Sequence, residues 1–230
     1  MTDDTTSVLI PLPAPAPGVS AWLTHLVRAP EEIAALAALL SAAESARAAR
    51  FGRPELRDRY VVGRGSLRML LGARLDLPPQ RVVIERGHRG RPFTPQDAHL
   101  DFNVSHTRDV ALVGLADRPR IGVDIEHRER ILNVAGVARK FMSPAEQALL
   151  ASLADDERRR TLLRLWTCKE AMSKATGDAL AAPFRHIDVD LADGMRVRDG
   201  PPPYLPARMH LHPVAVPGGF LATVALWDHD

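Results

Sequence analysis

Apolar and polar positions change their period several times along the chain, and each change predicts an element. Recurrence at i, i+3 and i+4 predicts helices over residues 30–51 and 54–75, then near 133–140, 143–153 and 156–176. Short apolar runs bounded by turn residues predict strands at 19–25, 81–85, 100–105, 109–116 and 121–126, and more within 186–228. The Pro-rich stretch 8–18 predicts a loose lead-in. Groups of helices therefore alternate with groups of strands.

The later helices carry clear end signals. Ser143 precedes Pro144 and stands three residues before Glu146, which is the spacing of a capping box with proline at the first helical position. Gly177 follows the last periodic residue of the long helix and predicts its end.

The order of elements occurs twice. Glu44 and Glu146 stand at similar helix starts, and Val110–Asp117 resembles Leu221–Asp228 at an offset of about 110 residues. We therefore predict an α+β fold of two similar halves, 1–119 and 120–230, related by a pseudo-two-fold. Each half packs helices on a small, mostly antiparallel sheet, and a ligand site is expected in the cleft between them.

Two polar clusters carry the candidate chemistry. Asp124 and Glu126 flank one apolar residue in a strand-like run, so both carboxylates face the same side. Glu170 and Lys174 are four residues apart and share a helix face. Converging carboxylates and lysines suit a hard cation and the phosphates that it bridges. The plainer alternatives are a polar strand edge and a surface ion pair, which is worth about 0.3–0.5 kcal/mol.

The composition of the chain supports the interpretation of these clusters as a phosphate site. Of 30 Lys and Arg residues only three are lysine, Lys140, Lys169 and Lys174, and two of these lie in the second cluster. Residues 41–91 hold an excess of seven positive charges, all from arginine, which attracts phosphates, nucleic acid or an acidic protein unless it is simply a solvated helix face. No apolar run has the length of a membrane span. The single cysteine, Cys168, excludes an internal disulfide and is expected to be buried packing.

From residue 41 to 189 the chain resembles 4′-phosphopantetheinyl transferases of the Sfp type. The resemblance is carried by four motifs in order: Phe102-Asn-Val-Ser-His106, Gly122-Val-Asp-Ile-Glu126, Phe141-Met-Ser-Pro-Ala-Glu146 and Trp166 to Lys174. It implies transfer of phosphopantetheine from coenzyme A to a serine of a carrier protein, with release of 3′,5′-ADP, at an active site between the two halves.

The resemblance also implies roles for individual residues. Asp124, Glu126 and Glu170 are the implied ligands of Mg²⁺, with Mn²⁺ as an alternative. Glu170, or a water on the metal, is the implied base, and Lys174 is implied to meet the α-phosphate and stabilise the leaving ADP. The implied coenzyme A contacts are Arg53, Arg59, Arg91, Ser105, His106, Lys169 and Lys174. The plainer interpretation of His106 is a satisfied core histidine.

The chain departs from the family pattern at two places. Arg91 stands where the family has the lysine of Gly-Lys-Pro, which keeps the charge but changes the geometry. Asp58 stands where histidine is frequent, which weakens the expected contact with the nucleotide. Glu146 is a further candidate near the metal, and its alternative is the capping box.

The implied partner is an acyl or peptidyl carrier protein, steered by Arg57, Arg64 and Arg68. We expect a cytoplasmic monomer that binds neither nucleic acid nor membrane. The rival hypotheses are an arginine-rich nucleic-acid-binding protein, a lapsed relative that only binds coenzyme A, and a metal-dependent hydrolase of nucleotide pyrophosphates. No zinc spacing or RNP-like aromatic pattern supports the first rival.

Overall fold

The computed structural model describes residues 8–192 and 194–229. The first half holds β1 (Ile10–Leu12), β2 (Val19–His25), α1 (Pro30–Ala37), α2 (Ala42–Ala48), α3 (Pro54–Leu75), β3 (Glu85–Arg86), β4 (Pro92–Phe93), β5 (Leu100–Thr107) and β6 (Val110–Asp117), with 3₁₀ turns at Pro79–Arg81 and His88–Gly90. Its main sheet has the order β1-β2-β6-β5, and β3 pairs with β4 in a small hairpin.

The second half begins with β7 (Arg120–His127). It continues with α4 (Val134–Phe141), α5 (Pro144–Ala151), α6 (Asp155–Thr176), β8 (Asp188–Asp190), β9 (Arg196–Asp199), β10 (Met209–Val214) and β11 (Phe220–Trp227), with 3₁₀ turns at Ala179–Ala181 and Phe184–His186. Its sheet has the order β7-β11-β10-β9-β8. All the strand pairings described in both halves are antiparallel.

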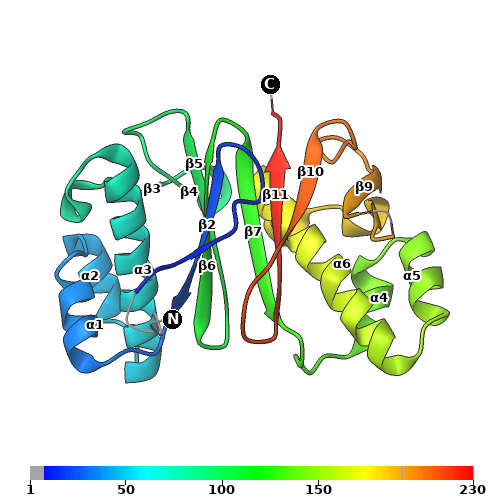
Figure 1. The fold of residues 1–230 in the computed structure, drawn as a ribbon, viewed down its shortest axis with the longest axis horizontal. Helices are drawn as coiled ribbons and strands as arrows, with labels where there is room; N and C mark the ends of the chain where they lie inside the picture. The colour runs from blue at the N-terminus through cyan, green and yellow to red at the C-terminus, as the bar shows by residue number, and fades with distance from the viewer. Residues whose placement is uncertain (1–7, 193, 230) are drawn as a thin grey trace.

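The two halves repeat one order of elements. Each runs from a strand through two short helices to a helix of 22 residues and later to an antiparallel hairpin. In each, the strand directly before the helices pairs with the last strand of that hairpin, β2 with β6 and β7 with β11. Figure 1 shows α1–α3 and α4–α6 on opposite sides of the central strands. The prediction of a two-half α+β fold is confirmed.

The first half differs from the sequence expectation in three places. The helix expected over 30–51 is two helices, because Ser41 caps a new start: its hydroxyl accepts from the Glu44 amide at 3.3 Å, and the Glu44 carboxylate accepts from the Ser41 amide at 2.9 Å. Of the strand expected at 81–85, Arg81 ends a 3₁₀ turn, residues 82–84 have no regular secondary structure, and only Glu85 lies in a strand, β3. The lead-in 8–18 contains β1. These errors come from short segments whose apolar content does not distinguish helix, turn and strand.

Hydrophobic clusters form three layers. One lies beneath α1–α3, one beneath α4–α6, and one between the two sheets, where Val19, Ala21 and Leu23 of β2 meet Val123 and Val224 from the second half. Burial of this middle layer joins the halves into one body.

Polar side chains also join the sheets. Every second residue of β5 is polar, and these side chains turn towards the edge of β7. The Asp101 carboxylate accepts from the Ile121 amide at 2.7 Å, and the Asn103 amide oxygen accepts from the Val123 amide at 3.1 Å. Side-chain acceptors thus satisfy edge amides of β7 that have no neighbouring strand to pair with. The contact sets β5 beside the acidic positions of β7.

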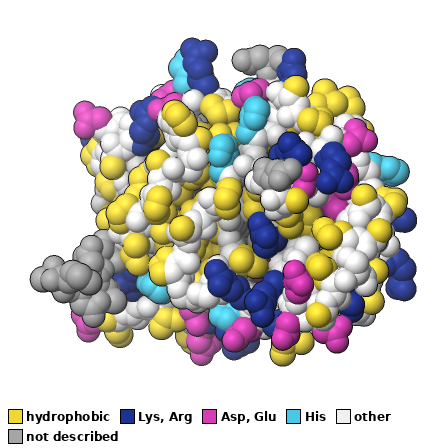
Figure 2. Space-filling view, turned by 45° about the vertical axis from the view of Figure 1, so that its right-hand side comes forward, with side chains coloured by type: hydrophobic (Ala, Val, Ile, Leu, Met, Phe, Trp, Pro, Cys, Tyr) yellow, Lys and Arg dark blue, Asp and Glu magenta, His cyan; other side chains and the backbone are white. Residues whose placement is uncertain are grey.

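On the face seen in Figure 2, Lys and Arg side chains are mixed with Asp and Glu side chains over a partly apolar surface. None of the described helices has the length and apolar character needed to cross a membrane.

Candidate functional site

Asp124 and Glu126 point to the same side of β7, as the alternation predicts. Both are buried, with 4% and 8% of the residue surface exposed. Gly122 precedes them on the same face, and a Cβ atom there would lie 1.9 Å from the carbonyl oxygen of Ala171 and 2.5 Å from the amide nitrogen of Ala175. Only glycine allows α6 to approach β7 this closely. The close approach brings Glu170 and Lys174 to the two carboxylates.

Lys174 joins α6 to both neighbouring strands. Its ammonium donates to Asp124 Oδ1 at 2.6 Å, to Ser105 Oγ at 2.9 Å and to the Val123 carbonyl at 3.2 Å. Ser105 Oγ also donates to Asp124 Oδ1 at 2.8 Å. The predicted residues Ser105, Asp124 and Lys174 therefore form one hydrogen-bonded group.

Glu126 has partners that the sequence interpretation did not include. Thr107 donates to its carboxylate at 3.2 Å, and Arg130 forms an ion pair with it. Burial raises the pKa of Glu126, against the opposing charge of Arg130 and with a smaller contribution from Asp124. Thr107 lies two residues after Ser105 on β5, so strand alternation could have placed both side chains on the same face. Arg130 lies in the loop after β7, and no periodic pattern in the sequence identifies it.

Among the described residues, two buried carboxylate oxygens have no hydrogen-bond partner, Asp124 Oδ2 and Glu170 Oε1. Burial raises the pKa of Glu170, Lys174 opposes the shift, and repulsion from Asp124 and Glu126 adds to it. Unpartnered buried carboxylate oxygens are costly unless a cation or donor satisfies them. Three carboxylates with two free oxygens therefore fit a hard divalent ion.

Within residues 8–192 and 194–229, no group of three or more His, Cys, Asp and Glu side chains has the arrangement of a formed metal centre. The positive charges beside the carboxylates are Lys174 on Asp124 and Arg130 on Glu126. A cation at this site would compete with these two side chains for carboxylate oxygens.

Ser105 and His106 are neighbours on β5 and so face opposite sides. Whereas Ser105 faces Asp124, His106 lines a cavity of about 590 Å³ against α3. Desolvation by the pocket walls, and then the charge of Lys174, lower the pKa of His106, although its side chain stays exposed within the cavity. The plainer interpretation of His106 as a core residue is therefore wrong.

We call this cavity the α3 pocket. Five arginines line it together with two aromatic rings: Arg47, Arg59, Arg64, Arg86, Arg108, Phe51 and Tyr60. The rings of Phe51 and Tyr60 lie 5.4 Å apart, and the Arg47 guanidinium lies 5.4 Å from the Tyr60 centroid. Positive charge and flat rings suit a phosphorylated aromatic ligand. Arg59 was predicted here. Arg47 and Arg86 belong to the arginine-rich segment without being singled out, Arg64 was named only as a steering residue, and Arg108 lies outside that segment.

Other predicted residues lie outside this group. Arg53 is largely exposed, 3.7 Å from Glu55. Asp58 pairs with Arg57 at 2.8 Å. Arg91 is mostly buried, where its guanidinium contacts Asp101 and the second half.

Lys169 is not brought to the candidate site. Its ammonium lies 2.8 Å from the Glu146 carboxylate and donates to the carbonyls of Phe184 and Ile187 at 2.7 and 2.6 Å, with none of its side chain exposed. One residue along a helix is a turn of about 100°, so Lys169 faces α5 while Glu170 faces β7. The expectation of a phosphate contact at Lys169 is therefore not supported by its position.

Glu146 and Cys168 have structural roles in the fold. Glu146 accepts from the Ser143 amide at 2.8 Å and from the Val189 amide at 2.9 Å, which is the predicted capping box extended to β8. Cys168 is fully buried, and burial raises the pKa of its thiol to about 12, so it is packing as predicted.

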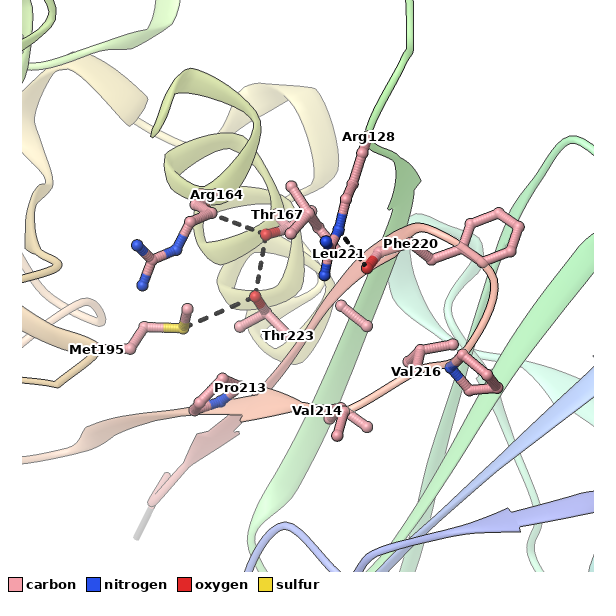
Figure 3. A pocket seen from close by; sticks show the side chains of 13 residues that line it. Arg128, Arg164, Thr167, Met195, Pro213, Val214, Val216, Phe220, Leu221 and Thr223 are labelled. Carbon is pink, nitrogen blue, oxygen red and sulfur yellow. Dashed lines mark hydrogen bonds between the residues drawn. The ribbon is translucent and has the colours of Figure 1, made fainter. Parts of the chain in front are cut away.

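A second cavity of about 460 Å³ lies between α6 and the β10–β11 hairpin (Figure 3). Arg128 and Arg164 stand on either side of it in Figure 3, and the hydroxyls of Thr167 and Thr223 meet inside it at 3.0 Å. None of the predicted site residues is among the described residues that line this cavity.

Two family models and several curated proteins match this chain. Residues 120–208 match the model of the 4′-phosphopantetheinyl transferase superfamily, and residues 28–118 match the model described as 4′-phosphopantetheinyl transferase, N-terminal. The chain is 39% identical over 166 residues to the 4′-phosphopantetheinyl transferase HetI of Nostoc sp., which covers 71% of this chain and 70% of the relative. It is 29% identical to the transferase ffp of Bacillus subtilis, over 73% of each chain, and 27% identical to Sfp of Bacillus subtilis strain 168, over 62% of each.

Proposed function

Because the chain belongs to the 4′-phosphopantetheinyl transferase superfamily, we propose that it transfers 4′-phosphopantetheine from coenzyme A to a serine of an apo acyl or peptidyl carrier protein. The observation that carries this proposal is the hydrogen-bonded group of Ser105, Asp124 and Lys174, with Glu170 beside it. It joins three elements at the place where the two halves meet.

Coenzyme A is proposed to lie between the α3 pocket and this group. Arg59 and His106 line the pocket, and Ser105 stands on the next position of the same strand. The lining arginines other than Arg64, which is paired with Glu44, supply charge for the phosphates of the nucleotide. The aromatic pair supplies flat surface for its base. Lys169 is not among the proposed contacts, because its ammonium is buried against Glu146.

Asp124, Glu126 and Glu170 are proposed to hold Mg²⁺, or Mn²⁺ in its place. The two unpartnered carboxylate oxygens support this assignment. The ion, when bound, neutralises the pyrophosphate oxygens and so lowers the cost of charge that develops on them.

In the proposed reaction the carrier serine oxygen bonds to the phosphorus that carries the pantetheine arm. The bond from that phosphorus to the oxygen shared with 3′,5′-ADP breaks, and ADP leaves with the electron pair. The serine proton passes to Glu170 or to a water. Lys174 is proposed to stabilise the negative charge of the leaving phosphate, because its ammonium lies beside Asp124, one of the proposed metal ligands.

The proposed partner is a carrier protein, but the steering residues need correction. Arg64 and Arg68 both pair with Glu44, at 3.0 and 2.5 Å, and their side chains are 16% and 3% exposed. Of the three arginines named from the sequence, only Arg57 is well exposed. A charge engaged inside the fold contributes little to long-range attraction, so α3 alone does not form the expected basic face.

Three further properties stay proposals. Residues 1–119 and 120–230 are proposed as the coenzyme A half and the metal half. The protein is proposed to act as a monomer, because both sides of the site come from one chain. Its use of coenzyme A and its buried free cysteine support a cytoplasmic location.

The test is intact-mass spectrometry of an apo carrier protein incubated with coenzyme A, Mg²⁺ and the enzyme. Transfer adds about 340 Da to the carrier. We expect the gain with wild type and with Glu157→Gln, an exposed change on the same helix, and its loss with Glu170→Gln. A nucleotide pyrophosphatase, a lapsed relative or a nucleic-acid-binding protein would add no mass, and the family membership favours transfer over all three.

A separate measurement tests the metal. Mg²⁺ is expected to raise the melting temperature of the wild type, because an ion that binds only the folded state stabilises it. Glu170→Gln removes one ligand charge and is expected to reduce the shift, whereas Glu157→Gln is not. Equal shifts in all three proteins would place the ion elsewhere.

A further inference from the structure

Arg91 lies in the turn between β3 and β4 and reaches across to the second half. Its side chain is only 10% exposed. The guanidinium forms an ion pair with Asp101 of β5, donates to the carbonyl oxygen of Lys174 in α6, and donates to the carbonyl of Ile121 in β7 at 2.8 Å. The same three elements carry Ser105, Lys174 and Asp124. One side chain therefore ties together every element that supplies the hydrogen-bonded group.

The contact with Lys174 is made at the end of a helix. α6 ends at Thr176, so the carbonyl of Lys174 is among the last four, which have no donor within the helix. A cation there satisfies the carbonyl and interacts favourably with the helix dipole. Arg91 thus holds the backbone of the residue whose ammonium bonds to Ser105 and Asp124.

The carboxylate of Asp101, which pairs with Arg91, is also held in place. Asp101 also accepts from the Ile121 amide at 2.7 Å, so the carboxylate that pairs with Arg91 is itself bound to β7. Asp101 and Ser105 lie on the same side of β5, four residues apart. The position of the last turn of α6 relative to Ser105 is therefore determined through Arg91 and Asp101.

We propose that Arg91 is a positioning residue, which fixes the last turn of α6 and thereby the ammonium of Lys174, and that it does not bind a coenzyme A phosphate. The inference rests on the proposed transfer reaction for its effect on rate. Two nitrogens of a planar fork serve three acceptors here, a geometry that the single ammonium of lysine does not reproduce.

The kinetic test compares Arg91→Met and Arg91→Lys with Arg120→Met. Arg120 lines the same cavity of about 180 Å³ beside Arg91, but its guanidinium lies over the Trp227 ring, 5.9 Å from the centroid. We expect both Arg91 variants to lower kcat by about 10-fold or more, because small displacements of a reacting group are costly. KM for coenzyme A should change by less than about 3-fold, and Arg120→Met should change neither constant.

The opposite pattern would overturn the proposal. A phosphate contact predicts that Arg91→Met raises KM for coenzyme A and that Arg91→Lys restores it, since lysine also binds phosphate. If Arg91→Met does not fold, Arg91→Lys alone decides the question, because it keeps the charge beside Asp101. The double variant Arg91→Met with Lys174→Ala should lose no more activity than Lys174→Ala alone; additive losses would contradict action through Lys174.

Hydrogen exchange tests the contact without any substrate. Amides in a peptide covering residues 172–178 should exchange faster in both Arg91 variants than in wild type or Arg120→Met, because the last turn of α6 opens more often. Unchanged exchange would show that Arg91 does not hold the helix. Absence of transfer by the wild type would instead contradict the proposed function, and the exchange result would still decide the structural part.

Discussion

Gly122→Ala tests the contact on which the whole site depends. A Cβ atom at position 122 would lie 1.9 Å from the Ala171 carbonyl oxygen and 2.5 Å from the Ala175 nitrogen, whereas real Cβ contacts stay above 3.0 Å. Both neighbours are helix backbone, so no side-chain rotation relieves the overlap. α6 must move away from β7 by about 1 Å.

That movement separates the two halves of the site. Glu170 and Lys174 are carried on α6, whereas Asp124 and Glu126 are carried on β7, so the separation acts on every contact between them. The hydrogen bond between Lys174 and Asp124 is now 2.6 Å. A misplacement of about 1 Å costs about 100-fold in rate, which corresponds to roughly 2.7 kcal/mol. The overpacked core costs about 1–3 kcal/mol in stability, or roughly 2–12 °C in melting temperature.

The assay is kcat/KM for transfer to an apo carrier protein, measured at a temperature where thermal unfolding shows each variant to be folded. Gly114→Ala is the matched control. Its Cβ would meet Val123 Cγ1 at 2.6 Å and Ile121 Cδ1 at 2.7 Å, a milder overlap with side-chain atoms on the opposite face of β7. We expect it to lower the melting temperature while kcat/KM stays within about 3-fold.

Two results would contradict a site set by the approach of α6 to β7. Folded Gly122→Ala with kcat/KM close to wild type would show that the approach of α6 does not place the site. Equal losses of activity in both variants would show a general effect of destabilisation.

Three further predictions concern the arginine pocket and the buried charges. Arg59→Met should raise KM for coenzyme A by about 10-fold, because it removes one charge-assisted hydrogen bond. Arg57→Met, at an exposed position, should leave KM unchanged. Equal effects of the two changes would mean that the nucleotide binds elsewhere. Lys169→Met leaves Glu146 buried without its ion-pair partner and should lower the free energy of unfolding in urea by about 3–5 kcal/mol. The double variant Lys169→Met with Glu146→Gln should recover part of this loss. A loss below about 1 kcal/mol in Lys169→Met would contradict the prediction. Burial raises the pKa of Glu44, but hydrogen bonds from Arg68 and the Ser41 amide and the charge of Arg64 outweigh burial, so the net shift is downward. The stabilisation by Glu44 is therefore present above the ordinary carboxyl pKa of about 4.3 and is lost as the pH falls further. The stability difference between wild type and Glu44→Gln should shrink below that pH, and a constant difference would argue against a charged Glu44.

Much of this arrangement could be predicted from local patterns. Strict alternation in β7 placed Asp124 and Glu126 on one face, and four-residue spacing placed Glu170 with Lys174 on α6. The serine and glutamate of the capping box at residues 143–146 specify a helix start without any tertiary contact. These features follow from the 2.0 and 3.6 periods of strand and helix, which a sequence displays directly.

Other features depended on which surfaces pack together. Lys169 and Glu170 are neighbours on one helix, and only the packing of α5 and β7 against different sides of α6 decides that one is buried with Glu146 and the other is at the site. Likewise, Arg68 became a buried partner of Glu44, and Arg91 became a bridge between halves. The sequence gives only the charge of an arginine and the length of its side chain. The carboxylates and carbonyls that surround it come from distant segments, so its role is settled when those segments fold against it.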